Sequence, residues 1–344
     1  MSNKKVFLYV GNFGYQGDKY PVFEDSDITG FHADEFVITC GGYNRYLLDI
    51  TPLTEYLDEM TTLARRVIQL TGKHVWLGFP APPAPTQTIT LDEYNHYADQ
   101  YLTIAPMVKE RMDAGGTDYY YYYVEGFYMN DEHVRRKTFG NGTGSDDPHG
   151  VNTDVNNLLQ HPQIFMYNKV SQGLMSSAHG WKKLLWCPFT GRGANYDTTM
   201  IDIAYIANTT DIFDTVLIQP SYYFHGHQDA NIFKNLDLVK NSMNLQEALR
   251  RTNDGRTNVR VVAKTSSTII GCQMEIDERY FNPLLEDPDN LQSGYIERYQ
   301  AYVDAFSGSN ITSSANRVFS FYCDKKNPYW TQTQAKVNEF FDTL

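Results

Sequence analysis

Apolar residues along the chain fall into eight short runs of the kind that forms buried strands. Between most of these runs, apolar residues recur every three or four positions, as they do along one face of a helix. Strands that alternate with helices indicate βαβ units, in which crossover helices join parallel strands. The predicted strands span residues 6–10, 36–40, 74–79, 122–129, 183–188, 215–219, 272–277 and 317–323.

Local capping signals mark where helices begin and end. Thr51-Pro52 predicts an N-cap followed by proline at the first helical position, and the apolar periodicity that follows ends at Gly72. Thr90 and Glu93 have the spacing of a capping box at the start of a second helix. Two further helices are predicted at residues 291–306 and 333–344.

The whole pattern predicts an α/β fold, a (β/α)8 TIM barrel that forms a single domain over residues 1–344. No stretch rich in Pro, Gly or Ser divides the chain. Residues 258–265 form either a ninth strand or part of the helix before the seventh strand. Long βα loops, which build the site of a barrel enzyme, are expected at residues 11–35, 130–156 and 220–229.

Charge and hydropathy indicate which partners and which cellular location to expect. The chain has 29 basic and 41 acidic residues, a net charge of −12, and no long basic run, so we expect no nucleic-acid partner. No apolar run approaches the roughly 20 residues of a membrane span, so we expect no membrane partner. The first residues lack the apolar core of about 7–15 residues that a signal peptide needs. This predicts a cytoplasmic protein, or a secreted one if a signal peptide has been removed.

Four cysteines lie far apart, each within or at the end of an apolar run. We expect reduced thiols in the core. A Cys272–Cys323 disulfide or a metal site is the alternative.

Acidic residues gather at the ends of the fourth and seventh predicted strands. Asn130, Asp131 and Glu132 emerge together after the fourth strand. In the seventh, Glu275 and Asp277 alternate with apolar residues, which predicts that both acids face the barrel interior. Buried carboxylates are costly unless they are paired or used for chemistry.

Glu132 and Glu275 are the candidate catalytic pair, because these two strand ends face each other across a barrel mouth. A retaining glycosidase needs a protonated acid and an ionised carboxylate about 5–5.5 Å apart, whereas about 6.5–9.5 Å favours inversion. By analogy with many retaining barrel glycosidases, Glu132 is the predicted general acid/base and Glu275 the nucleophile. The structural alternative places Glu132 in solvent at a helix N-terminus and Glu275 in a buried ion pair.

Four segments resemble, in the same order, the motifs of one bacterial family. GFYMNDEHV, LLWCPFTG, FDTVLIQPSYYF and GCQMEID are similar to GFYW-x-x-E, W-x-PY, FD-x-x-x-x-QPNYFF and G-x-x-EIE of the family catalogued as domain of unknown function 4855. The resemblance implies a TIM-barrel protein with glycoside hydrolase-like activity on a polysaccharide. The motif acids fall on Glu132, Glu275 and Asp277, and Met129 stands where the family usually has Trp.

Aromatic and polar side chains near the predicted strand ends are the candidate sugar contacts. Aromatic rings can stack on the faces of sugars, and amides or carboxylates can bond their hydroxyls. Trp186 has an alternative role in filling the barrel core. The candidate substrate-binding residues are Asn12, Asn130, Trp186, Phe189, Gln219, Tyr222, Tyr223 and Asp277.

The predicted activity is hydrolysis of a glycosidic bond in an oligo- or polysaccharide, with no cofactor. The acidic chain favours neutral or cationic glycans. A non-catalytic glycan-binding barrel is the main alternative. A metal-dependent hydrolase using His225, His227, which Asp229 follows, and an Asp at a strand end is a lesser one. We expect no metal, because the first strand lacks the paired histidines of barrel amidohydrolases.

Overall fold

The computed structural model describes residues 3–13, 18–40, 50–82, 90–132, 161–189, 196–220, 223–224, 264–282, 284, 292–307, 318–322 and 325–344. Within them, eight parallel strands close into a barrel in the order β1-β10-β9-β8-β7-β6-β5-β4. All eight predicted strands are present, and the predicted (β/α)8 barrel is confirmed. The strands are β1 (Asn3–Val10), β4 (Glu35–Cys40), β5 (His74–Gly78), β6 (Val124–Met129), β7 (Lys183–Trp186), β8 (Thr215–Ile218), β9 (Ile269–Glu275) and β10 (Val318–Tyr322).

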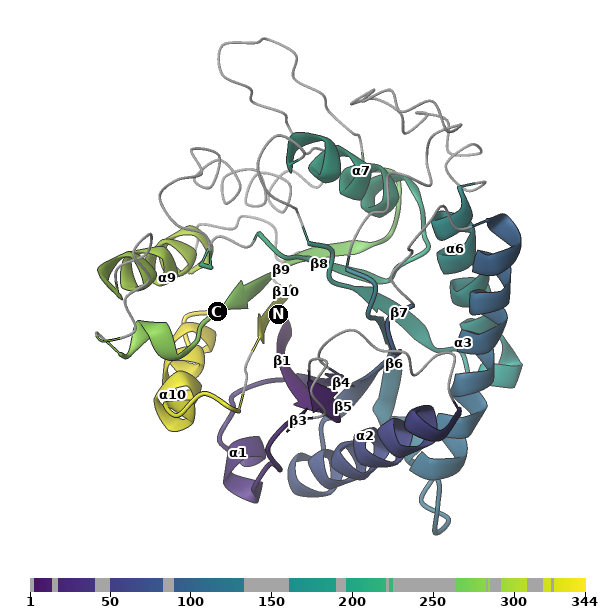
Figure 1. Cartoon of the computed structure of the whole chain (residues 1–344), viewed down its shortest axis with the longest axis horizontal. Coiled ribbons are helices and arrows are strands. Elements are labelled where there is room, and N and C mark those ends of the chain that lie inside the picture. The colour runs from purple at the N-terminus through teal and green to yellow at the C-terminus, as the bar shows by residue number, and fades with distance from the viewer. Residues whose placement is uncertain are drawn as a thin grey trace.

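Helices surround the barrel, as Figure 1 shows. None of the helices in the described ranges is long and apolar enough to cross a membrane. A short antiparallel pair, β2 (Asn12–Phe13) and β3 (Asp18–Lys19), follows β1. The helices are α1 (Asp25–Thr29), α2 (Ile50–Thr71), α3 (Leu91–Met112), α4 (Tyr119–Tyr123), α6 (Pro162–Leu174), α7 (Tyr196–Thr209), α9 (Gln292–Phe306) and α10 (Trp330–Phe341), with short 3-10 turns η2 (Ser177–His179) and η4 (Glu278–Tyr280).

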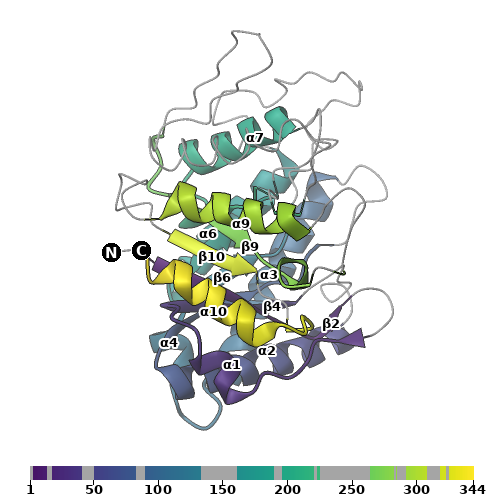
Figure 2. The ribbon, with the colours of Figure 1, turned by 90° about the vertical axis from the view of Figure 1, so that its left-hand side faces the viewer.

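The two ends of the barrel are distinct. In Figure 2 the amino ends of the strands lie on the left, near the two chain termini and α4. β2, which continues from the carboxyl end of β1, lies on the right. We call the right-hand end the mouth of the barrel.

Most of the predicted helix signals are found, with two corrections. Thr90 and Glu93 form the predicted capping box, and Gly72 adopts a left-handed φ of 65° just after α2. Helix α2 begins at Ile50, so Thr51 lies inside it and is not its N-cap. The fourth strand begins at Val124 rather than residue 122, because the tyrosines before it form α4.

The barrel interior is filled mainly by aromatic and aliphatic side chains. Trp76 and Tyr128 lie among Phe7, Leu185, Leu217 and neighbouring residues, and both are almost fully buried. Gly126 makes room for the indole, since a Cβ there would lie 2.2 Å from the carbonyl of Lys183 and 2.8 Å from the Trp76 ring. Because side chains fill the interior, the place for an active site is the mouth, where the strands end.

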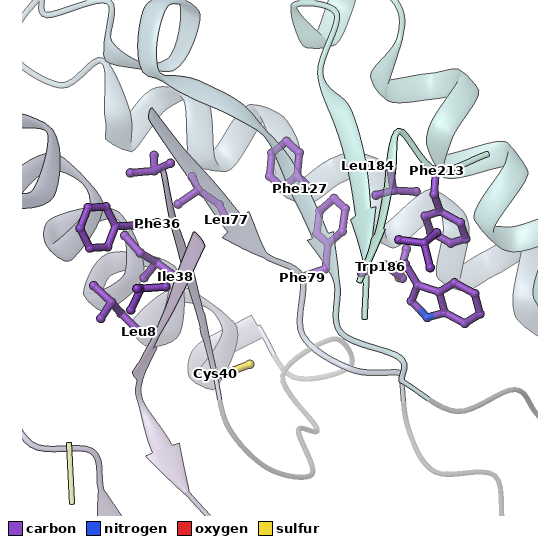
Figure 3. Packing of buried hydrophobic residues seen from close by; sticks show 14 of the residues in the cluster. Leu8, Phe36, Ile38, Cys40, Leu77, Phe79, Phe127, Leu184, Trp186 and Phe213 are labelled. Carbon is purple, nitrogen blue, oxygen red and sulfur yellow. The ribbon is translucent and has the colours of Figure 1, made fainter. Parts of the chain in front are cut away.

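A second, larger apolar layer lies between the barrel and its helices. Figure 3 shows part of it, including Phe79 against Phe127 and Trp186 beside Phe213. The rings of the first pair are stacked with their centroids 4.5 Å apart, and those of the second are 5.0 Å apart. Outward positions on the strands therefore hold the helices in place.

A buried ion pair occupies the amino end of the barrel. Lys5, 2% exposed, forms a salt bridge with Glu35, which also accepts hydrogen bonds from Trp76 Nε1 (2.6 Å) and Asn3 Nδ2 (2.8 Å). Burial alone would raise the pKa of Glu35, but Lys5 and these donors lower it below its usual range. Burial lowers the pKa of Lys5 despite the attraction of Glu35. The pair therefore stabilises the fold only while both partners are present.

Cys40, Cys187 and Cys272 are buried, and none of these three forms a disulfide. Burial raises the pKa of Cys40 to about 11, which keeps its thiol protonated at neutral pH. Their burial agrees with the predicted core thiols. Cys323, and with it the alternative Cys272–Cys323 pairing, lies outside the described residues.

Candidate active site at the carboxyl end of the barrel

Glu132 lies at the mouth, three residues beyond the end of β6. The hydroxyl of Tyr128, an interior residue of β6, donates a 2.9 Å hydrogen bond to Oε1 of Glu132. The backbone of Glu132 is held as well, because its carbonyl accepts a 2.8 Å hydrogen bond from the amide of Phe189 beyond β7. The carboxylate is therefore anchored over the barrel interior from two neighbouring strands.

Side chains continue to alternate between the two faces beyond the last residue of β6, so Asp131 and Glu132 point to opposite sides. Asp131 is buried on the opposite side, where Oδ2 accepts 3.0 Å hydrogen bonds from Gln163 Nε2 and the Tyr167 hydroxyl of α6. Asp131 thus fastens α6 to the barrel, which leaves Glu132 as the acid of this segment available for chemistry.

A group of tyrosines lines the mouth beside Glu132. The ring of Tyr9, at the end of β1, lies 5.5 Å from that of Tyr20 and 5.0 Å from that of Tyr322. Tyr20 and Tyr322 are half-buried, so part of each remains accessible. We call Tyr9, Tyr20, Tyr128 and Tyr322 the mouth tyrosines.

The negative charge of Glu132 helps to raise the pKa of neighbouring side chains. Burial, and then the negative charge of Glu132, raises the pKa of Tyr128 well above its ordinary value. Burial likewise raises the pKa of Cys187, with Glu132 adding to the effect. For Tyr9, burial raises the pKa most, followed by Tyr322 and Glu132. Tyr128 therefore remains protonated and can donate to the carboxylate.

Two predicted amide contacts tie strand ends together at this mouth. Gln219 pairs with Phe189 beyond β8 and β7, and its side chain donates 2.8 Å to the carbonyl of Cys187. Asn130 donates 3.1 Å to the carbonyl of Cys40 at the end of β4. Asn12 lies in β2 and pairs with Lys19 of β3. These residues shape the rim around Glu132.

Glu275 is the last residue of β9 and is 4% exposed. Its Oε2 accepts a 2.7 Å hydrogen bond from the hydroxyl of Tyr302 on α9 and a longer one, 3.4 Å, from the backbone amide of Tyr223. Both groups donate hydrogen to this oxygen, while Met274 and Ile276 on either side of Glu275 belong to the outer layer. In the register of the barrel, Glu275 pairs with Tyr322 of β10, one of the mouth tyrosines.

Asp277 and Tyr223 form a polar cluster with Arg279 instead of facing a ligand. Tyr223 donates 3.0 Å to Oδ1 of Asp277, and Arg279 binds Oδ2 through Nε at 2.8 Å and Nη2 at 2.6 Å. Tyr223 has no exposed surface, and its ring packs on Tyr295 of α9. The structure does not support Asp277 or Tyr223 as sugar contacts, because their polar atoms and ring faces are already occupied.

Trp186 is also not supported as a sugar contact. Its side chain is fully buried in the outer layer, between Tyr167 of α6 and Phe213, and does not fill the barrel interior. Its indole donates 2.8 Å to the carbonyl of Asp131. The register of β7 turns Trp186 outward and its neighbour Cys187 inward.

Several predicted residues lie outside the described ranges, namely Tyr222, His225, His227 and Asp229. Within the described residues, no cluster of three or more His, Cys, Asp or Glu side chains could hold a metal ion.

Comparison with known proteins gives a fold likeness at low sequence identity. No family model matches the chain, and no curated protein matches it. A glycoside hydrolase family 5 enzyme from Prevotella bryantii B14 aligns with a TM-score of 0.51 and 8% identity, over 98% of this chain and 94% of its own. A family GH18 chitinase from Chromobacterium violaceum aligns with a TM-score of 0.50 and 12% identity, over 98% and 83%. The chain has a glycoside hydrolase-like fold.

A third solved structure of this fold, the xylanase and alpha-amylase inhibitor protein XAIP-II from Scadoxus multiflorus, has a TM-score of 0.46 and 12% identity, over 100% of this chain and 99% of its own. At these identities the likeness concerns the glycoside hydrolase-like fold alone.

Sequence reasoning did not identify the mouth tyrosines. Tyr9 follows Phe7 at period two along β1, and Tyr128 precedes Glu132 by four positions. This alternation was a usable signal, because positions separated by two or four residues on a strand share one face. Tyr20 carried no such signal, since it lies in the segment after β3.

Proposed function

We propose that this chain hydrolyses glycosidic bonds in an oligo- or polysaccharide, with Glu132 as general acid/base and Glu275 as nucleophile. The observation that carries the proposal is the carboxylate of Glu132, anchored at the mouth by Tyr128 and bordered by tyrosine rings. The site of a barrel enzyme is built at this end. Membership of the family catalogued as domain of unknown function 4855 is part of the same proposal.

In this mechanism Glu132 protonates the oxygen of the leaving sugar while Glu275 attacks the anomeric carbon. A covalent glycosyl-enzyme forms on Glu275, and the glycosidic C–O bond breaks. Water then attacks the anomeric carbon, with Glu132 accepting its proton, and the ester to Glu275 is released.

The surroundings of the two carboxylates support different roles. Glu132 is half-buried beside aromatic rings, so a substrate oxygen can reach it. Glu275 accepts hydrogen bonds from Tyr302 and Tyr223, as an ionised nucleophile requires. Hydrolysis of a glycosidic bond also suits the fold, since two solved structures with this fold are glycoside hydrolases.

The mouth tyrosines are the best candidates for the sugar platform, in place of Trp186 and Tyr223. Tyr20 and Tyr322 are half-buried, and each combines an apolar ring with a hydroxyl, which suits the CH face and hydroxyls of a sugar. Asn12, Asn130, Phe189 and Gln219 are the predicted contacts that remain at the rim.

Two glutamine substitutions test the proposal after a substrate has been found by screening polysaccharides. Glu132→Gln and Glu275→Gln should each lower turnover by about 10²–10⁴-fold while leaving sugar binding measurable. Glu297→Gln, at an exposed position of α9, is the control and should keep full activity. Azide should restore turnover to Glu275→Ala by forming a glycosyl azide, because azide occupies the space of the lost nucleophile.

Three results would count against parts of the proposal. A parent protein that binds glycans but cleaves none supports the non-catalytic barrel. Full activity in Glu275→Gln removes the nucleophile assignment but leaves Glu132 as the acid. Activity that is abolished by EDTA and restored by a divalent metal ion supports the metal-dependent alternative.

A further inference from the structure

Three aromatic side chains are exposed at the amino end of the barrel, opposite the mouth. Tyr121 is 65% exposed, Tyr122 is 63% exposed and Trp181 is 63% exposed. Helix α4, which carries the two tyrosines, lies in Figure 2 on the side of the chain termini, far from β2. We call these three residues the amino-end patch. The proposed hydrolase site makes no use of them.

The segments that carry the patch are fastened together. Lys182 Nζ donates 2.8 Å to the carbonyl of Tyr120 and 2.5 Å to that of Val124. The hydroxyl of Tyr120 donates 2.9 Å to the carbonyl of His179, and Tyr120 is itself buried. Residues 179–182 therefore pack directly on residues 120–124, which joins the segment that carries Trp181 to the segment that carries Tyr121 and Tyr122.

The backbone of Trp181 is in a costly conformation. Its φ of 57° lies in the left-handed region, which is unfavourable for a bulky residue. Its amide donates 3.1 Å to the carbonyl of Ser176, and the amide of Lys182 donates 2.9 Å to the carbonyl of Leu174. A strained backbone that presents a large indole to water, rather than burying it, indicates a binding role.

The chemistry of the patch favours a neutral glycan chain. The rings of Tyr121 and Tyr122 stand at 89° with centroids 5.1 Å apart, so each offers a different face. Tyrosine and tryptophan combine an apolar face with a donor at the edge, which matches the CH face and the hydroxyls of a sugar. The exposed Asp118 next to α4 adds an acceptor for hydroxyls. A net charge of −12 disfavours polyanions.

We infer that the amino-end patch is a second glycan-binding site, which holds a neutral polysaccharide away from the mouth of the barrel. The choice of a glycan rests on the proposed function, because a hydrolase of polymers gains from holding its substrate at a second point. Linked binding raises the effective concentration of the polymer at the enzyme. Short oligosaccharides cannot bridge the two ends of the barrel, so the site acts on polymers alone.

Native gel electrophoresis with a soluble neutral polysaccharide in the gel tests this inference. The probes are hydroxyethyl cellulose, galactomannan and mixed-linkage β-glucan. At least one should retard the parent protein. Trp181→Gly combined with Tyr122→Ala should weaken retardation by about tenfold or more, since central aromatic residues dominate such contacts. Trp181→Gly alone is the milder variant, because glycine relieves the left-handed strain while it removes the indole.

Two controls separate this site from the mouth. Glu132→Gln should be retarded like the parent, whether or not the hydrolase proposal is correct. Leu91→Ala, which removes another exposed apolar side chain at the start of α3, should also be retarded like the parent. If the parent protein is an active hydrolase, variants of the amino-end patch should lose activity on the polymer. The same variants should keep activity on a short oligosaccharide.

The inference is overturned if no probe retards the parent, or if Trp181→Gly is retarded as strongly as the parent. It is also overturned if the patch variants change the molar mass measured by light scattering and leave retardation unaltered. That result would assign the patch to contact between two copies of the chain.

Discussion

The hydroxyl of Tyr128 donates a 2.9 Å hydrogen bond to the carboxylate of Glu132, four residues further along the same barrel strand and its extension. Tyr128 is 1% exposed and packs against Phe7 inside the barrel, with ring centroids 5.2 Å apart. The barrel core thereby holds a residue that in turn positions the candidate acid. Strand geometry alone makes this contact possible, because the two side chains point to the same side.

Tyr128→Phe should lower kcat by about tenfold or more with little change in KM, because a hydrogen bond to a charged group contributes about 1.5–3 kcal/mol. The alkaline limb of the rate profile should move to higher pH, since the ionised carboxylate loses a donor. Rate profiles of the parent and variant check this. An unchanged profile would mean that Tyr128 serves packing alone.

Trp186→Phe should lower the free energy of unfolding by about 1–3 kcal/mol and leave KM unchanged. The variant loses volume between Tyr167 and Phe213, and it leaves the carbonyl of Asp131 without the indole donor. Urea denaturation and steady-state kinetics measure the two effects. A KM that rises while stability is kept would restore Trp186 as a sugar contact.

Lys5→Met should cost up to about 3–5 kcal/mol of stability, because it leaves the largely buried Glu35 carboxylate without its cation. Lys5→Met combined with Glu35→Gln should recover part of this loss, since no unpaired charge remains. Denaturation curves of the two variants and the parent give the comparison. Equal stability of the single and double variants would contradict a strongly coupled pair.

Buried tyrosines should make the fold sensitive to alkali. Burial raises the pKa of Tyr56 well above its ordinary value of 10.0, as it does for Tyr9 and Tyr128. Above about pH 10 the unfolded chain loses protons that the folded chain keeps, so stability falls as pH rises. Each such tyrosine should contribute a loss of about 1.4 kcal/mol per pH unit.

Urea denaturation between about pH 9 and pH 11 measures this slope. Tyr56→Phe, which removes the hydroxyl bonded to the carbonyl of Gly78 at 2.6 Å, should reduce the slope by one tyrosine's share. If the slope of the variant equals that of the parent, Tyr56 titrates normally in the fold.

The candidate site was predictable only in part. The position of Glu132 after an alternating strand was sufficient to predict its place at the mouth. Trp186 and Tyr223 were predicted as exposed platforms, yet both are fully buried. Aromatic residues at strand ends suit either environment, and the choice depends on which helix packs against that strand end.

The sequence by itself determined the barrel. Period-two and three-to-four apolar patterns depend on local backbone geometry, so the eight strands and most of the helices could be placed from them. Only the tertiary structure decided what each polar strand end contacts. Tyr302 on α9 reaches Glu275, and Arg279 takes up Asp277, through contacts that arise only once helices and strands are packed together. The grouping of Tyr9, Tyr20 and Tyr322 has the same origin, because closure of the barrel brings β1 beside β10.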